Sequence, residues 1–530
     1  MARFLVFFLL ICFQAQAQFD WPEELRLIPE KTHYEKTSTY ADVIQFLKAQ
    51  SALSKDMRVI SMGKSPEGKD IPVAVLAHPM VNSAEEARSS GKLIIYIQGN
   101  IHAGEVEGKE VVMMEIRRLL SSPDASFFDK IIILFAPIYN TDSNDQMAYG
   151  RRPSQDNSPP EVGIRENSQG LDLNRDGMKM EAPETNGLFQ LINEWDPQLF
   201  VDLHTTNGTW HNWNLTWAPS YHYAGEKGPY DFTMTMLKDI SKAIPQKYNL
   251  NFGPYGDYYL REDGWPATKF FTYNHHPRYL VNQFGLRNRM AILSEAFAHE
   301  NFEKRIWSTQ SFVTEIIGYA VDHAQEIISI NKRAEENTMK NAGSLQPKGV
   351  RFKMVPSEVL RNMPTYDYKY DSANKRWEHT DLKKYLDSVV YYGGFEPETT
   401  SKVPAGYVIP KNMTRVVENL RKHGISVEEL KKNKKMTGDV FEIEKYETAQ
   451  RKFEGHAMAR ATGKFVAAAK KFKKGDFLVT MAQPLGNLVF YLLEPESDDG
   501  LVTWNFFDES IQNQKSQNQS LRYPVFRYYK

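Results

Sequence analysis

Cysteine is almost absent from this sequence: the 530 residues include one, Cys12. A single cysteine excludes disulfide bonds within the chain, and it excludes zinc sites built on cysteine pairs. Because Cys12 lies in a segment that we expect to be cleaved off, the mature chain would have no thiol chemistry. Its stability must then come from apolar cores alone.

An excess of charge of either sign is also missing. The 65 Lys and Arg residues are balanced by 66 Asp and Glu residues, and the formal net charge is -1. Nucleic acids and anionic membranes select a basic surface, so neither is expected as a partner. Long apolar runs are absent as well. The stretch 4–13 is too short to span a bilayer, and we predict no membrane span.

Residues 1–17 have the composition of a secretory signal peptide. Arg3 supplies a positive charge, the apolar stretch 4–13 follows, and Ala15-Gln16-Ala17 is a small-residue cleavage sequence. We expect cleavage near Ala17 and an exported mature protein, either periplasmic or secreted. The remaining length exceeds one ordinary core and predicts two or three domains.

Between about residues 90 and 325, short apolar runs alternate with longer segments of helical period. The apolar runs are 93–97, 131–138, 199–203 and 290–293, and the helical segments are 106–120, 184–195, 230–244 and 302–328. Apolar runs without polar alternation indicate strands buried on both faces. Strands that alternate with helices predict an α/β sheet covered by helices.

The pattern changes after a linker, "NAGSLQPKG", that begins at Asn341. Residues 350–530 contain shorter strand-like runs and one amphipathic helix near 411–423. We expect them to form a separate α+β or β-rich domain of unknown role, and we expect residues 18–340 to form the first domain.

Several catalytic motifs are missing from the chain. It has no G-x-S-x-G nucleophile elbow and no H-E-x-x-H zinc-peptidase helix. The stretch "GEVEGKE" lacks the spacing of a phosphate-binding loop, and Glu110 stands where such a loop has Ser or Thr. The chemistry must therefore come from residues that are distant in the sequence.

Polar side chains follow three of the apolar runs. His102 and Glu105 follow the first, His204 follows "LFVDL", and Glu295 follows "MAIL". In an open α/β sheet the carboxyl ends of the strands border the ligand crevice. Two His and one Glu are a donor set of catalytic zinc sites, and a further Glu suits a general base. Each residue also has an ordinary interpretation, such as a first-turn helix carboxylate for Glu105.

Other polar residues suit supporting roles. Asp202 lies two residues before His204, so both side chains leave the strand on the same face. In "GLDLNRD", Asp172 suits a carboxylate that accepts a hydrogen bond from a ligand histidine and fixes its tautomer. Asn174 and Arg175 either brace the loop or bind a substrate carboxylate, which the planar guanidinium fits well.

Taken in order, "HAGE", "LDLNRD", "VDLHTTNG" and "ILSEAF" resemble the zinc carboxypeptidases related to pancreatic carboxypeptidase, peptidase family M14. The resemblance covers roughly residues 35–330, and the C-terminal part resembles the trailing region of large exported bacterial members. It implies an α/β/α sandwich around a mixed sheet, with residues 18–340 as the catalytic domain and 350–530 as an accessory domain. It also implies a metallocarboxypeptidase with one Zn²⁺ per chain and a peptide or peptide-like substrate that has a free carboxylate.

The resemblance assigns roles residue by residue. It implies zinc ligands His102, Glu105 and His204, a general base Glu295, a substrate-carboxylate anchor of Asn174 and Arg175, and a support for the first ligand histidine in Asp172. The arginine that stabilises the oxyanion is expected to be Arg151 or Arg152, with Arg165 as the third arginine of that loop. The tyrosine that covers the substrate is Tyr273 or Tyr279. Arg287 and Arg289 either contact an anionic substrate or lie in a solvated loop.

Two alternatives to peptide trimming stay open on the sequence. One is a cell-wall peptide hydrolase or another amide hydrolase on the same zinc site, which a substrate panel would distinguish. The other is a non-catalytic module that binds peptides or glycans, against which the complete set of ligands and base argues. The sequence does not set the preferred terminal side chain or the oligomeric state.

Overall fold

The computed structural model describes residues 21–529 except 156, 158 and 222. The predicted signal peptide, its cleavage site and Cys12 lie outside the described residues. Within them, every helix is too short or too polar to cross a membrane.

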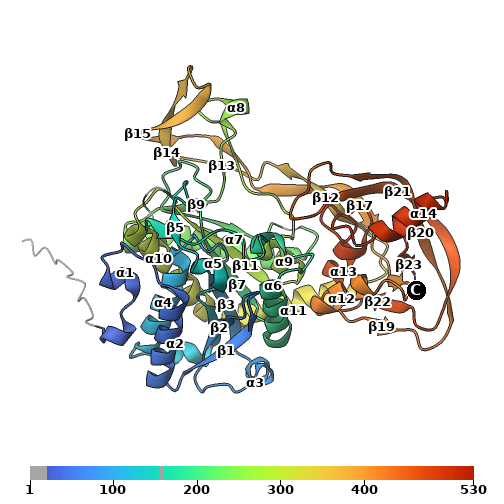
Figure 1. The fold of residues 1–530 in the computed structure, drawn as a ribbon, viewed down its shortest axis with the longest axis horizontal. Coiled ribbons are helices and arrows are strands. Elements are labelled where there is room, and N and C mark those ends of the chain that lie inside the picture. The colour runs from blue at the N-terminus through green and yellow to red at the C-terminus, as the bar shows by residue number, and fades with distance from the viewer. Residues whose placement is uncertain (1–20, 156, 158, 222, 530) are drawn as a thin grey trace, which may run out of the picture.

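An eight-stranded mixed sheet forms the centre of the N-terminal half (Figure 1). Its strand order is β1 (Met57–Lys64), β2 (Asp70–Leu76), β4 (Ile131–Ala136), β3 (Leu93–Gly99), β7 (Leu199–Thr205), β11 (Met290–Ala296), β8 (Leu215–Pro219) and β9 (Phe252–Pro254). The four middle strands β4, β3, β7 and β11 run parallel. They are the four strands that the apolar runs predict.

Helices cover both faces of this sheet because the middle strands are apolar on both sides. On β3, Ile95 and Ile97 belong to a core with α2 (Tyr40–Leu53), α4 (Glu107–Leu120), α7 (Lys227–Tyr248) and α10 (Phe302–Asp322). Ile94 and Tyr96 point the other way, into a core with α3 (Ala84–Ser89), α6 (Pro183–Trp195) and α9 (Leu280–Leu286). The α/β/α sandwich around a mixed sheet is therefore confirmed.

One predicted helix is divided in the structure. The segment 302–328 forms the end-to-end helices α10 and α11 (Ala324–Lys340), with His323 between them at φ -112° and ψ 18°. No glycine or proline marks this break. The helical period predicted for 302–328 continues across the break, and the charged helix that the sequence predicts over 325–340 corresponds to α11.

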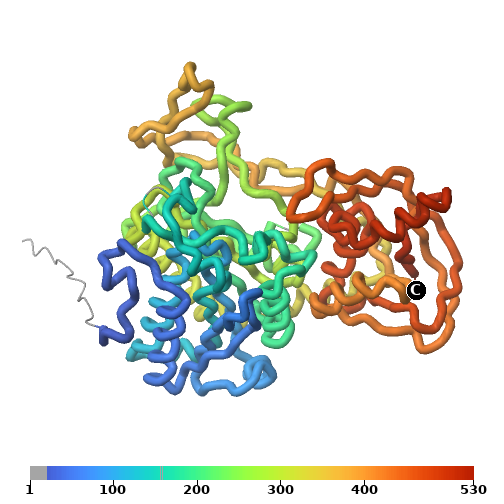
Figure 2. The backbone as a smooth tube through the Cα atoms, in the orientation of Figure 1, coloured from blue at the N-terminus to red at the C-terminus, as the bar shows by residue number. Residues whose placement is uncertain are grey.

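The C-terminal region is rich in β-structure, as predicted (Figure 1), and it lies beside the N-terminal half (Figure 2). A six-stranded sheet contains β19 (Glu428–Glu429), β22 (Phe477–Thr480), β18 (Gly406–Ile409), β23 (Phe526–Tyr528), β20 (Lys434–Thr448) and β21 (Ala459–Phe472). Around it lie β12 (Pro347–Val355), β17 (Gly394–Lys402), α12 (Thr414–Lys422), α13 (Gly486–Leu493) and α14 (Asp508–Ser516). The predicted amphipathic helix near 411–423 corresponds to α12.

The two halves share buried contacts. A hairpin of β14 (Met363–Asp371) and β15 (Arg376–Leu386) projects over the N-terminal half (Figure 1). Beside the hairpin lies a three-stranded sheet with β16 (Val389–Tyr392) in the middle. β16 pairs on one side with β13 (Glu358–Leu360) and on the other with β10 (Lys269–Phe271), which belongs to the N-terminal half. The division of the chain near residues 340–350 thus stays a prediction, and a β-sheet crosses it.

Candidate active site

The candidate active site lies where three neighbouring parallel strands end. β3 ends at Gly99 and leads into the loop that carries His102 and Glu105. β7 and β11 pair in a register that sets His204 opposite Glu295. Because parallel strands end at the same edge of a sheet, these four residues meet although 193 positions separate the first from the last (102 to 295).

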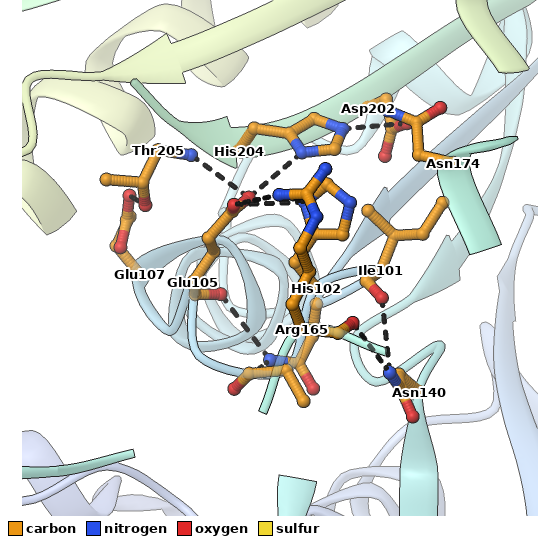
Figure 3. Close-up of polar contacts among 12 residues, drawn as sticks. Ile101, His102, Glu105, Glu107, Asn140, Arg165, Asn174, Asp202, His204 and Thr205 are labelled. Atoms are coloured by element: carbon orange, nitrogen blue, oxygen red, sulfur yellow. Dashed lines mark hydrogen bonds and ion pairs between the residues drawn. The ribbon is translucent and has the colours of Figure 1, made fainter. Parts of the chain in front are cut away.

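One carboxylate, that of Glu105, joins the two histidines (Figure 3). Its Oε1 lies 2.9 Å from His102 Nδ1, and its Oε2 lies 2.9 Å from His204 Nδ1. The ligand atoms of the three residues all lie within 4.8 Å of one another, and all three side chains are buried. Both Nδ1 atoms therefore point to one centre.

Each histidine has an acidic partner on its other ring nitrogen. His102 Nε2 lies 3.1 Å from Asp172 Oδ1 in hydrogen-bond geometry. His204 Nε2 lies 3.0 Å from Asp202 Oδ2, an ion-pair contact outside hydrogen-bond geometry. Carboxylates in these positions fix the tautomer that leaves Nδ1 free to bind a metal ion. The donor set, two imidazoles and a carboxylate, thus fits a zinc ion held through both Nδ1 atoms.

Strong local charges act on these groups. Burial alone would raise the pKa of Glu105, but the charges of His102 and Arg152 and hydrogen bonds from both histidines hold it well below its ordinary value. Burial would lower the pKa of His204, and the neighbouring Asp202 and Glu105 carboxylates raise it well above its ordinary value. The centre attracts positive charge.

Glu295 faces the same cavity. Its side chain is 8% exposed, and its Oε2 has no hydrogen-bond partner among the described residues. Burial raises the pKa of Glu295 well above the ordinary value, and the charge of Glu105 adds to this, while His204 acts in the opposite direction. A buried carboxylate with one free oxygen is placed to exchange a proton with a bound molecule.

Two of the three candidate arginines reach the cavity. Arg152 Nη2 lies 2.6 Å from Glu105 Oε1, and Arg165 Nη2 lies 2.8 Å from Asp172 Oδ2. Both line the cavity, whereas Arg151 is exposed and does not. Gly104 makes room for Arg152, because a Cβ at Gly104 would lie 2.5 Å from Arg152 Cγ.

The predicted carboxylate anchor lies in a short 3₁₀ turn, η3 (Leu173–Arg175), which Asp172 caps by accepting a hydrogen bond from the Asn174 N–H. Asn174 Oδ1 accepts a hydrogen bond of 3.0 Å from the Leu280 backbone. The Arg175 guanidinium lies 4.4 Å from the centre of the Tyr279 ring.

Both candidate tyrosines line the cavity with this anchor. The Tyr273 and Tyr279 rings meet edge to face at 5.2 Å, and the Tyr273 hydroxyl donates to Asn282 Oδ1. Arg287 and Arg289 do not line the cavity. They are buried elsewhere, where Arg289 pairs with Asp196 and Arg287 donates to the His423 carbonyl.

The cavity has a volume of about 250 Å³, and some of its lining was not anticipated from the sequence. Tyr255, Val281 and Leu293 line it together with Thr205 and Asn207, which stand one and three residues after His204. Tyr255 follows the three-residue strand β9, which has no signal in the apolar pattern. Thr205 and Asn207 stand within "VDLHTTNG", so their nearness to His204 in sequence was a usable signal.

Comparisons with known proteins find carboxypeptidases of similar sequence. Residues 43–177 match the family model described as zinc carboxypeptidase, and this segment contains His102, Glu105 and Arg175. Carboxypeptidase 2 of Trichophyton rubrum is 23% identical over 498 residues, which cover 88% of this chain and 81% of the relative. Carboxypeptidase 2 of Trichophyton tonsurans is 22% identical over 495 residues, with the same coverage of 88% and 81%.

Solved structures also show similarity, at lower levels. A metallo-carboxypeptidase from Burkholderia cenocepacia is 16% identical and covers 54% of this chain and 70% of its own, with a TM-score of 0.40. Carboxypeptidase A from Helicoverpa armigera is 15% identical, with coverage of 57% and 74% and a TM-score of 0.37. Residues 43–177 thus match the zinc carboxypeptidase family model, and the similarity to curated carboxypeptidases extends along most of the sequence.

Proposed function

We propose that this protein is a zinc-dependent carboxypeptidase that hydrolyses the C-terminal peptide bond of its substrates. One observation carries the proposal. The His102, Glu105 and His204 donor atoms converge within 4.8 Å, in a cavity that also contains the unpartnered Glu295 oxygen and the Arg175 guanidinium. A metal centre, a base and an anchor for a carboxylate thus face one space.

His102, Glu105 and His204 would hold the zinc ion, with Asp172 and Asp202 orienting the two imidazoles. When bound, zinc lowers the pKa of a water molecule and polarises the substrate carbonyl. Glu295 takes the proton from the attacking water and returns it to the leaving nitrogen. Its buried position suits this role, because a carboxylate with a raised pKa holds a proton more readily than an exposed one.

The arginines supply substrate position and charge. Arg175, with Asn174 beside it, would bind the free C-terminal carboxylate of the substrate and so select cleavage at the chain end. Arg152 or Arg165 would stabilise the oxyanion, since both line the cavity. Tyr279 packs on Arg175 and Tyr273 packs on Tyr279, so both tyrosines would cover a bound terminal residue.

Part of the remaining lining is apolar and aromatic, with Val281, Leu293, Tyr255 and Tyr273, beside the polar Thr205 and Asn207. It supports a preference for peptides that end in an apolar residue. We further propose that residues 18–340 form the catalytic domain and 350–530 an accessory domain. We also propose that the signal peptide directs the protein out of the cytoplasm, to a periplasmic or extracellular location.

The test is release of C-terminal residues from a mixed peptide pool, with zinc content measured on every preparation. Wild type and Glu303→Gln, a matched change at an exposed glutamate, are expected to release terminal residues. Glu295→Gln is expected to keep its zinc and lose the activity. A Glu295→Gln variant with wild-type activity would remove Glu295 from the mechanism. A wild-type chain without zinc would reject the ligand set.

A further inference from the structure

A second cleft lies beside the catalytic cavity. It has a volume of about 570 Å³ and is lined by Asn207, Gly208, Thr209, Trp210, Asp257, Tyr368, Arg376, Trp377, Glu378 and His379. Asn207 also lines the catalytic cavity, three residues after His204. The two spaces therefore share this residue in their linings. We call the second space the upstream cleft.

Two parts of the chain that are distant in the sequence form the walls of the upstream cleft. One wall is the loop after β7, together with Asp257 from the segment that follows β9. The other wall is the β14–β15 hairpin, which comes from the C-terminal region and extends over the N-terminal half (Figure 1). The hairpin thus adds a surface that the α/β/α sandwich itself does not contain.

Specific contacts fix the hairpin in place. Trp265 Nε1 donates to Asp367 Oδ1 at 2.7 Å, and the Tyr258 hydroxyl donates to Thr365 Oγ1 at 2.9 Å. Below them, a buried cluster joins residues of the two halves, among them Phe270 and Val389. A wall anchored in this way can hold a ligand without first having to be ordered.

Trp210 connects the hairpin to the catalytic strands. Its ring stacks between His299, at 3.7 Å, and His379 of the hairpin, at 3.5 Å. His299 follows Glu295 by four residues, and Trp210 follows His204 by six. The cleft is thereby held in fixed relation to both catalytic strand ends.

Arg175 and Asn207 both line the catalytic cavity, and of the two only Asn207 also lines the upstream cleft. Arg175 contacts Asp172, Asn174 and Tyr279, whereas Asn207 contacts Asp257 and Thr209. A substrate with its terminal carboxylate at Arg175 would extend past His204 and leave the cavity at Asn207. An extended chain advances about 3.3 Å per residue, so a few residues would bring it well into the second space.

The lining indicates which side chains fit there. Asp257 and Glu378 are carboxylates, and the Arg376 guanidinium pairs with Glu378 at 2.6 Å. Tyr368 and Trp377 add aromatic surface. Aromatic faces next to carboxylates attract cationic and aromatic groups and disfavour acidic ones.

We propose that the upstream cleft binds the residues of a peptide substrate that precede the scissile bond, and that it favours basic or aromatic side chains over acidic ones. This inference rests on the proposed carboxypeptidase function. It makes the protein an enzyme for peptides of several residues, in which the accessory hairpin contributes to substrate selection.

The experiment compares kcat/KM for an N-acylated dipeptide and for two pentapeptides that share its last two residues, one with upstream Lys and one with upstream Glu. With wild type, kcat/KM for the Lys pentapeptide is expected to be about tenfold higher than for the dipeptide or for the Glu pentapeptide. This factor corresponds to the energy of one aromatic or cation–π contact. Trp377→Ala should remove this advantage and leave the dipeptide unchanged. Trp377→Phe should retain most of it.

Tyr385→Ala is the matched control, because Tyr385 is an aromatic residue of the same strand that is 68% exposed and lies outside the cleft. It should leave kcat/KM unchanged for all three substrates. Equal kcat/KM values for short and long peptides would overturn the proposed role of the upstream cleft. An equal loss of kcat/KM on both in Trp377→Ala would do the same, and either result would leave the proposed function standing. If Trp377→Ala weakened only substrates that carry a cell-wall disaccharide, the cleft would bind sugar and the peptide assignment would be wrong. No release from any substrate would overturn the carboxypeptidase function itself, and this inference with it.

Discussion

At the scale of single residues, the carboxylates behind the histidines are as much a part of the site as the histidines themselves. Asp202 is fully buried, receives a hydrogen bond from Gln98 Nε2 at 3.0 Å, and lies against His204. Gln98 in turn accepts from the Tyr96 hydroxyl. This row of buried groups crosses from β3 to β7 and determines how His204 is oriented.

Asp202→Asn tests that orientation. The substitution keeps the shape and removes the negative charge, so zinc affinity should fall by about 10- to 100-fold. Competition with a chelator of known affinity measures the change. Asp239→Asn, at a residue that bonds only to the exposed Tyr319 hydroxyl among the interactions described, should leave zinc affinity unchanged. An unchanged affinity in Asp202→Asn would mean that the protein matrix alone orients His204.

Glu184 gives the molecule a pH-dependent stability away from the site. Burial raises the pKa of Glu184 from 4.5 to about 7, although Asn167 donates to its carboxylate. The folded state then binds the proton more tightly than the unfolded state, so stability falls as pH rises from about 4.5 to 7. Glu184→Gln should remove this dependence and stabilise the protein at pH 8, by up to about 3 kcal/mol. Thermal unfolding of wild type and the variant at pH 4 and pH 8 measures this pH dependence. A Glu184→Gln variant that is less stable than wild type at pH 8 would contradict the predicted direction of the effect.

The residues of the site were largely predictable because each stands directly after an apolar run. His102, His204 and Glu295 mark strand ends, and the structure brings them together with Glu105. The arginine was less predictable. Arg151 and Arg152 are adjacent in the sequence, and which one turns inward depends on the space beside Gly104, which is a tertiary contact.

At the scale of elements, α4 must pack very closely on β3 and β7 for Glu105 to reach both histidines. Gly108, in the first turn of α4, makes this approach possible, because a Cβ there would lie 2.7 Å from Leu203 Cβ. Gly99 at the end of β3 is equally tight, with Gly108 C at 2.6 Å from its added Cβ. The two glycines are therefore packing positions.

Gly108→Ala should destabilise the protein by about 1–3 kcal/mol and reduce activity, since α4 and Glu105 would move away from β7. Gly318→Ala is the matched change in α10, where nothing lies within 4 Å of the added Cβ. It should stabilise the protein by about 0.5–1 kcal/mol through higher helix propensity. Denaturant unfolding of both variants measures these effects. If both substitutions changed the free energy of unfolding in the same direction, the packing role of Gly108 would be contradicted.

Elements whose apolar residues recur with a clear period were predicted well, whereas short paired strands were not. The buried parallel strands and α4, α6 and α7 agree with the apolar pattern within a few residues. Strands such as β9, β10 and β13 have three residues each, too few to show a period. Their pairing depends on partners that are distant in the sequence, so local patterns do not reveal it.

At the scale of the whole molecule, the C-terminal region is joined to the N-terminal half by buried polar contacts. Arg278 pairs with Asp499 at 2.7 Å, and the hydroxyls of Tyr221 and Tyr391 lie 2.7 Å apart. Asn288 Nδ2 donates to the Pro484 carbonyl. A chain that ends after residue 345 would lose all these partners, together with β16.

We expect such a truncated chain to be insoluble or to melt at least about 10 °C below the full chain, because several kcal/mol of buried contacts are lost. A chain that lacks only residues 1–20 should melt like the mature protein. Differential scanning calorimetry of the purified chains makes the comparison. A truncated chain as stable as the full one would show that residues 18–340 are an autonomous domain, as the sequence pattern predicts.

The wide separation of the candidate catalytic groups along the sequence has a consequence for biogenesis. His102 and Glu295 meet only after β3, β7 and β11 have paired in parallel, and pairings of such high contact order form slowly. The hairpin beyond residue 363 arrives later still during synthesis. A nascent or incompletely folded chain consequently has no assembled centre, so its two imidazoles and its carboxylate can hold one metal ion together only after these strands have come into register.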